Sequence, residues 1–104
     1  MIYKVNARFR EGSAAEFLLK LRDGSIASQR PDGAEMVDSM NRAVVTESGE
    51  VEWSETCYCS PPLAHERRTV LDHYFCDLST EAIDAYQDYV GLPFMEYIAE
   101  LAEG

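Results

Sequence analysis

The side chains best suited to chemistry are concentrated between Trp53 and Arg68. This segment holds the only tryptophan, two of the three cysteines, one of the two histidines and the only adjacent pair of basic residues. Pro61 and Pro62 lie near its centre, where the backbone must leave regular strand geometry. If the chain has a chemical site, we expect it in this segment.

Cysteine and histidine ligands for a metal are present, but the spacing of the cysteines is unusual. Structural zinc sites commonly place two to four residues between paired cysteines, whereas one residue separates Cys57 from Cys59. On a strand their Cα atoms would be about 6–7 Å apart, which is near the limit for a disulfide. We therefore expect no metal and no other cofactor, and we interpret the cysteines as small buried side chains.

An enzyme is an alternative that the same residue types leave open. His65 or His73 would be the catalytic acid or base. Cys57 or Cys59 would contribute a thiolate or a metal ligand. A reactive thiolate needs a base beside it, and the sequence alone does not bring either histidine next to a cysteine.

The cluster His65-Glu66-Arg67-Arg68 follows the prolines and is a cationic spot on an acidic chain. Guanidinium groups match carboxylates or phosphates, and His65 or Glu66 would serve as acid or base if buried. Neighbouring residues of a strand point in opposite directions, so we expect one arginine, Arg67, to share a pocket with His65. The simpler interpretation is that both arginines pair with acidic side chains.

Our first functional hypothesis is a small homodimeric domain that binds a small anionic ligand between its sheet and its helices. The side chains of Trp53, Glu55 and Cys57 would share one face of a strand. The predicted ligand-binding residues are Trp53, Glu55, Cys57, His65 and Arg67. Aromatic side chains are also enriched in cores and dimer interfaces, and this is the simpler interpretation of Trp53.

Length and charge restrict the remaining classes of function. Residues 1–104 have the length of one domain and an ordinary globular composition. The net charge is −10, and residues 69–104 contain eight acidic side chains but no lysine or arginine. Such a surface repels nucleic acid and anionic membranes, so we expect neither as a partner. A third hypothesis is an acidic interaction module that holds a basic protein.

Targeting signals and disulfides are not indicated. No apolar run approaches the ~20 residues of a membrane span, and residues 1–9 lack the basic start and apolar middle of a signal peptide. Three cysteines are an odd number, which argues against a closed disulfide framework. We expect a cytoplasmic protein with reduced thiols.

The first third of the chain has clear local patterns. Alternation of apolar and polar residues predicts a strand over residues 2–9. Its buried face would consist of Tyr3, Val5, Ala7 and Phe9. A capping box then predicts a helix over 13–23, and Pro31-Asp32-Gly33 is typical of a turn.

The middle of the chain is harder to assign. Residues 35–46 fit a helix or a strand, and we favour a strand over at least 39–46. Another strand is predicted over 50–59. Residues 61–76 are again ambiguous, and their β-branched and aromatic side chains favour a strand over 67–78 after a loop at the prolines.

The last third predicts two helices. The first would begin at Ser79 or Thr80 and end before Gly91, and the second would begin at Pro93. The order β-α-β-β-β-α-α suits an α+β fold, a four-stranded antiparallel sheet with helices on one face, close to the ferredoxin-like topology. Pairing the open faces of two such sheets gives a dimeric α/β-barrel, so we expect a homodimer.

Overall fold

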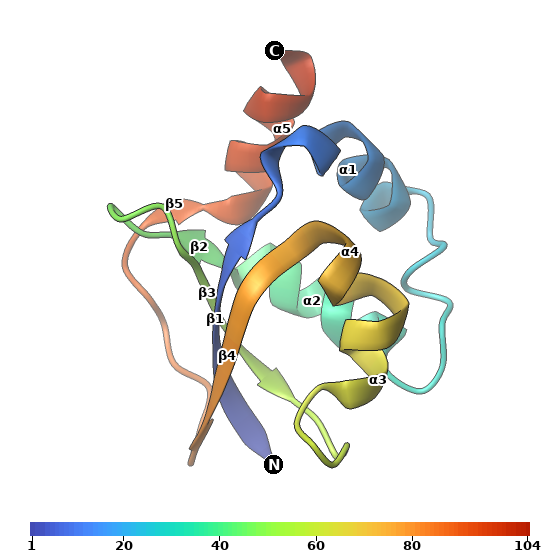
Figure 1. Ribbon diagram of the computed structural model, residues 1–104, viewed down its shortest axis with the longest axis vertical. Helices are drawn as coiled ribbons and strands as arrows, with labels where there is room; N and C mark the ends of the chain where they lie inside the picture. Colours follow the sequence, from blue (N-terminus) through green and yellow to red (C-terminus); the bar gives the residue numbers. More distant parts are fainter.

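Five antiparallel strands form one sheet in the order β4-β1-β3-β2-β5, with the helices mainly on one side of it (Figure 1). The computed structural model describes all residues from 1 to 104. The strands are β1 (Ile2–Phe9), β2 (Val44–Val45), β3 (Val51–Thr56), β4 (Phe75–Ile83) and β5 (Leu92–Pro93). The helical elements are η1 (Glu11–Ser13), α1 (Ala14–Arg22), α2 (Gly33–Arg42), α3 (Ala64–Glu66), η2 (Arg67–Leu71), α4 (Asp72–Tyr74) and α5 (Phe94–Glu103).

The α+β class is confirmed, but the predicted strand count of four is wrong. The fifth strand, β5, pairs with β2 over two residues at the edge of the sheet. Its proline belongs to an edge strand, where a missing backbone N–H removes no interior ladder bond. A two-residue strand has no room for the alternation by which strands are recognised in a sequence.

The alternating face predicted for β1 is confirmed. The side chains of Tyr3, Val5, Ala7 and Phe9 are all buried on the helix side of the sheet. The predicted helix after it is also confirmed, as α1. Its Phe17 ring stacks on Tyr74 with ring centroids 4.3 Å apart, and burying one such aromatic ring stabilises the fold by roughly 1.5–3 kcal/mol.

Most of one edge of β3 has no strand beside it, because β2 pairs with only its first two residues. The backbone groups of Ser54 and Thr56 are satisfied by α2 instead. Glu35 accepts a hydrogen bond from the Thr56 N–H at 2.8 Å, and Arg42 donates one to the Ser54 carbonyl at 3.1 Å. Exposed strand edges invite pairing with other chains. Here the side chains of one helix cover the edge and hold that helix against β3.

The strand predicted over 39–46 is wrong for most of its length. Residues Gly33–Arg42 form α2, and only Val44–Val45 is strand. Met36 and Met40 lie one turn apart on α2 and are both buried. The helix buries two large side chains in the core, and the valines that follow form only the two-residue strand β2.

The strand predicted over 67–78 is wrong for residues 67–74, and β4 begins at Phe75. Residues 64–74 form one continuous helical segment made of α3, η2 and α4, and η2 has π-helical hydrogen bonding. This segment buries Val70 and Tyr74, which are one helical turn apart. Tyr74 packs on α1, so a contact far away in the sequence decides between the two patterns.

The helix predicted from Ser79 or Thr80 is wrong as well. β4 continues to Ile83, because β1 supplies a partner along nearly its whole length. Residues 84–91, which we call the crossing segment, then pass over the sheet face opposite the helices to reach β5 (Figure 1).

The face under the crossing segment is polar along its middle. Lys4 and Asn6 of β1 both contact Glu52 of β3, at 3.5 Å and 3.1 Å. Tyr89 of the crossing segment bonds Ser54 at 2.9 Å and lies under the Lys4 ammonium group. The homodimer expected through this face stays a prediction.

The helix predicted after Pro93 is confirmed as α5. Phe94 and Ile98 lie one turn apart and are fully buried against the rest of the core. None of the helices in the molecule combines the length and apolar character that crossing a membrane requires.

Substitution of Gly33 by alanine should destabilise the fold by about 1–3 kcal/mol through overpacking. A Cβ at this position would lie 2.1 Å from the carbonyl oxygen of Ile26, which is backbone and cannot rotate away. Gly12→Ala is the matched control, because a Cβ there meets nothing within 4 Å. Urea denaturation measures both; equal midpoints for the two variants would contradict the close approach at the start of α2.

Candidate functional site

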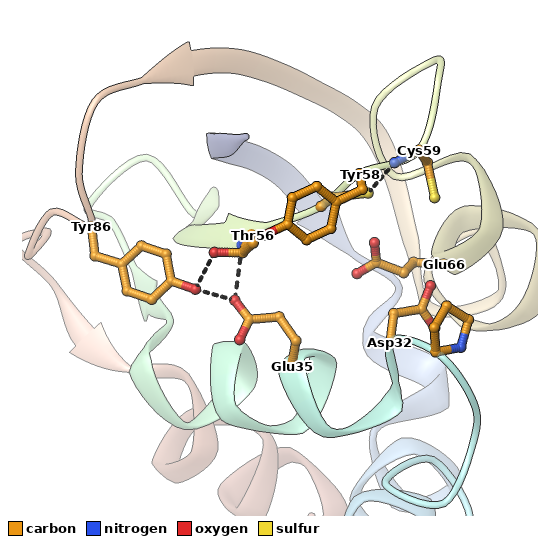
Figure 2. Close-up of a pocket in the computed structure, with 9 residues that line it drawn as sticks. Asp32, Glu35, Thr56, Tyr58, Cys59, Glu66 and Tyr86 are labelled. Carbon is orange, nitrogen blue, oxygen red and sulfur yellow. Dashed lines mark hydrogen bonds between the residues drawn. The ribbon is translucent and has the colours of Figure 1, made fainter.

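A pocket of about 530 Å³ lies where the end of β3, the loop after it, the start of α2 and the end of α3 meet. It is lined by Pro31, Asp32, Glu35, Thr56, Cys57, Tyr58, Cys59, Glu66 and Tyr86. Small-molecule sites commonly enclose about 300–1,000 Å³, so the volume suits such a ligand. Figure 2 shows the Glu66 carboxylate pointing toward the space between Tyr58 and Glu35.

Glu66 is the most unusual residue of the pocket. It is fully buried, and neither of its carboxylate oxygens has a hydrogen-bond partner. Burying an ionised carboxylate without a partner destabilises the folded state by roughly several kcal/mol, because the charge loses its hydration. The side chain therefore needs a proton or a cation from whatever occupies the pocket.

Asp32 supplies a second unpaired oxygen. Its Oδ2 lies 2.8 Å from His65 Nδ1, whereas its Oδ1 is buried without a partner. The residue belongs to the predicted turn and directly precedes α2, and the contact with His65 ties that turn to α3. One carboxylate thus holds the histidine and still offers an acceptor inside the pocket.

Glu35 is already satisfied, in contrast to Asp32 and Glu66. It accepts hydrogen bonds from the Thr56 N–H and the Tyr86 hydroxyl, and Arg42 lies 3.4 Å from it. The Arg42 guanidinium also stacks on the Tyr86 ring, 4.6 Å from its centroid. Burial and the hydrogen bond to Glu35 raise the pKa of Tyr86, which keeps the phenol protonated. These contacts fix Tyr86 at the mouth of the pocket.

Two thiols lie beside Glu66. The ligand atoms of Cys57, Cys59 and Glu66 are all within 4.8 Å of one another. The Cys59 N–H donates a hydrogen bond to Cys57 Sγ at 3.2 Å. Burial raises the pKa of the Cys57 thiol, while this N–H and that of Leu63 act to lower it.

Glu55 is buried behind the pocket on the helix-facing side of β3. Its Oε1 accepts a hydrogen bond from the Trp53 indole at 2.8 Å, and its Oε2 has no partner. Burial, with a smaller contribution from the nearby Glu35 and Asp32 charges, raises the pKa of Glu55 to about 8. At neutral pH the side chain is a neutral acid within the core.

The structure brings together only part of the predicted site. Cys57 lines the pocket, and His65 reaches it through Asp32. Trp53 is fully buried in the core and forms no part of the lining. Arg67 pairs instead with Asp72 at 3.0 Å on the surface.

His73 lies elsewhere. It is exposed on α4 and lines a separate hollow of about 230 Å³ between α4 and the end of α1. It therefore has no place beside the two cysteines, and His65 is the histidine that the fold brings close to the carboxylates.

Three lining residues that the sequence analysis does not name as site residues are Asp32 before α2, Glu35 in α2 and Tyr86 of the crossing segment. Asp32 was visible only as a turn residue and Glu35 only as part of an ambiguous segment. The sequence predicts a helix around Tyr86. The usable signal was the polar turn before α2, since loops on a rigid scaffold commonly carry functional side chains.

Comparison with protein-family models, with curated proteins and with solved structures finds no match to this chain.

Glu55→Gln should remove a pH dependence of stability. The carboxyl has a pKa near 8 when folded and 4.5 in its ordinary state, so its contribution is fully present below pH 4.5. The contribution of Glu55 to the free energy of unfolding then falls by about 1.4 kcal/mol per pH unit as the pH rises toward 8. Gln keeps an acceptor for the Trp53 indole but does not titrate.

Urea denaturation between about pH 5 and pH 8 measures this slope. The matched control is Glu100→Gln, which removes an exposed carboxylate on α5 and should keep the wild-type slope. An unchanged slope in Glu55→Gln would show that the buried carboxyl does not titrate as described.

Proposed function

We propose that this domain binds a small cationic molecule, of the primary-amine class, in the pocket beside β3. The observation that carries the proposal is the unpaired, buried Oδ1 of Asp32, in a pocket whose lining contains three carboxylates and no lysine or arginine. An ammonium group has three donors and no acceptor. It would donate a hydrogen bond to the unpaired Asp32 oxygen and bring a positive charge to the carboxylates.

The aromatic residues at the mouth support the same ligand class. Tyr58 is 87% exposed and Tyr86 is 43% exposed, and both rings border the opening. A cation within about 6 Å of such a ring gains roughly 0.5–1 kcal/mol at an exposed site. The Arg42 guanidinium already contacts the Tyr86 ring in this way, 4.6 Å from its centroid.

The charges favour a cation over the anionic ligand predicted from sequence. That prediction relied on Arg67 entering the pocket, and Arg67 is instead paired with Asp72 on the surface. Arg42 does not line the pocket and is occupied by Glu35, at 3.4 Å, and by the Ser54 carbonyl. An anion would meet carboxylates without a facing cation.

A second candidate function is acid–base catalysis by His65, which the sequence offered as an alternative. The observation that favours it is the 2.8 Å contact of His65 Nδ1 with Asp32. A carboxylate in that position orients the imidazole ring. An amine held by the other oxygen of Asp32 would lie close to this histidine.

Within this proposal the fold is a variant of the ferredoxin-like arrangement, and the chain works as a homodimer in the cytoplasm. Up to Ile83 the order is β-α-α-β-β-α-β, which has one helix more than the ferredoxin-like order, and the strand order β4-β1-β3-β2 within the sheet supports the first part. β4 lies at an edge of the sheet and supports the second, because its outer side has backbone groups available to another copy.

Ligand class can be tested with three probes of equal chain length: n-butylammonium, n-butanol and butyrate. We expect n-butylammonium to bind most tightly in an NMR titration. Asp32→Asn should weaken it about tenfold or more, as a charge-assisted hydrogen bond contributes roughly 1.5–3 kcal/mol. Asp38→Asn, on the exposed side of α2, is the matched control and should bind as the wild type does.

Tighter binding of butyrate would overturn this proposal and favour the anionic ligand. Equal binding of all three probes would also overturn it, because the pocket would then select for the apolar chain alone.

A further inference from the structure

Two cysteines and a glutamate lie together in the pocket, and the amine proposal gives the two thiols no role. Cys57 and Cys59 come from the loop that leaves β3, and Glu66 ends α3. Their two sulfur atoms and a carboxylate oxygen lie within 4.8 Å of one another. Soft thiolates together with one carboxylate are ligands that zinc accepts, whereas calcium and magnesium require oxygen ligands.

Glu66 is the independent observation that points to a bound cation. Its carboxylate is completely buried and both oxygens lack partners, although it faces a pocket rather than closed core. A thiol is only a weak hydrogen-bond donor, so neither cysteine can satisfy it. A metal ion at this point would pair the charge and occupy the oxygens at once.

A backbone N–H next to the cysteines contacts the sulfur of Cys57. The Cys59 N–H donates a hydrogen bond to Cys57 Sγ at 3.2 Å. Leu63 adopts a left-handed φ of 62°, which is uncommon for a branched side chain. Such outer-shell N–H groups typically orient metal ligands and tune them.

The short cysteine spacing, which argued against a metal in the sequence, loses its force in the fold. β3 ends at Thr56, so Cys57 and Cys59 are not held at the fixed separation of a regular strand. Tetrahedral zinc has Zn–S bonds of about 2.3 Å and Zn–O bonds of about 2.0–2.2 Å, which separates its ligand atoms by roughly 3.5 Å. The loop needs only a small contraction to reach that geometry.

We propose that Cys57, Cys59 and Glu66 bind one zinc ion, with its fourth coordination position open to the pocket. Three protein ligands and one open position are typical of catalytic zinc, whereas structural zinc has four protein ligands. Water or a nitrogen-containing ligand in the pocket would complete the coordination. The metal site goes beyond the amine proposal and does not depend on it.

The test uses the whole chain, stripped of metal with a chelator and kept reduced with a phosphine that is not itself a thiol. Titration with Co²⁺, a spectroscopic substitute for zinc, should saturate at one ion per chain. Thiolate-to-cobalt charge-transfer absorption should appear, and zinc should displace the cobalt. Zinc should also raise the melting temperature, because it binds the folded state.

Variants assign the ligands. Cys57→Ser and Cys59→Ser should each lower cobalt affinity more than about 100-fold, since even an outer-shell loss costs roughly 10–100-fold. Cys76→Ser is the matched control, because Cys76 is a half-buried cysteine on β4 away from the cluster, and it should bind as the wild type does.

Glu66→Gln keeps the test decisive if a cysteine variant fails to fold. Without its buried charge the metal-free variant should melt higher than the wild type, and zinc should raise its melting temperature much less. No charge-transfer band in the wild type, or equal affinity in the wild type and all three ligand variants, would overturn the site. The amine titrations contain chelator throughout, so the two proposals fail separately.

Discussion

The unpaired edge of β3 is the constraint on which the rest of this structure depends. β2 is too short to cover it, so the peptide groups of Ser54 and Thr56 are bonded by Arg42 and Glu35 of α2. These two contacts fix α2 along β3, and thereby the turn that carries Asp32. The same Arg42 and Glu35 hold Tyr86. The need to bond the peptide groups of Ser54 and Thr56 thus positions both Asp32 and Tyr86 at the pocket.

The sequence was sufficient to predict a helix or strand wherever the local pattern of apolar residues decided the structure. β1 and α5 show this, because alternation in one and a four-residue spacing in the other match the faces that are buried. Residues 67–78 and the region after Ser79 had two patterns of similar strength. Pairing with β1 and packing of Tyr74 on α1 decided between them. Such contacts join residues more than fifty positions apart and leave no local periodicity.

The candidate site divides in the same way. Cys57 and His65 were recognisable by residue type alone, and Glu66 was noticed as an acid or base that burial would make significant. Arg67 was misplaced because it was assigned to a strand; on a helix, the residue after the buried Glu66 turns by about 100° toward solvent. No pattern in the sequence distinguishes a carboxylate that faces a pocket from one that faces water.

The position of Tyr86 and α5 late in the chain has a consequence for how the protein is made. Asp32, the two cysteines and Glu66 all leave the ribosome before the tyrosine that closes the mouth and before Phe94 and Ile98, which complete the core. Domains fold as units during synthesis. The thiols of Cys57 and Cys59 therefore stay open to solvent in the nascent chain until Tyr86 and α5 follow them.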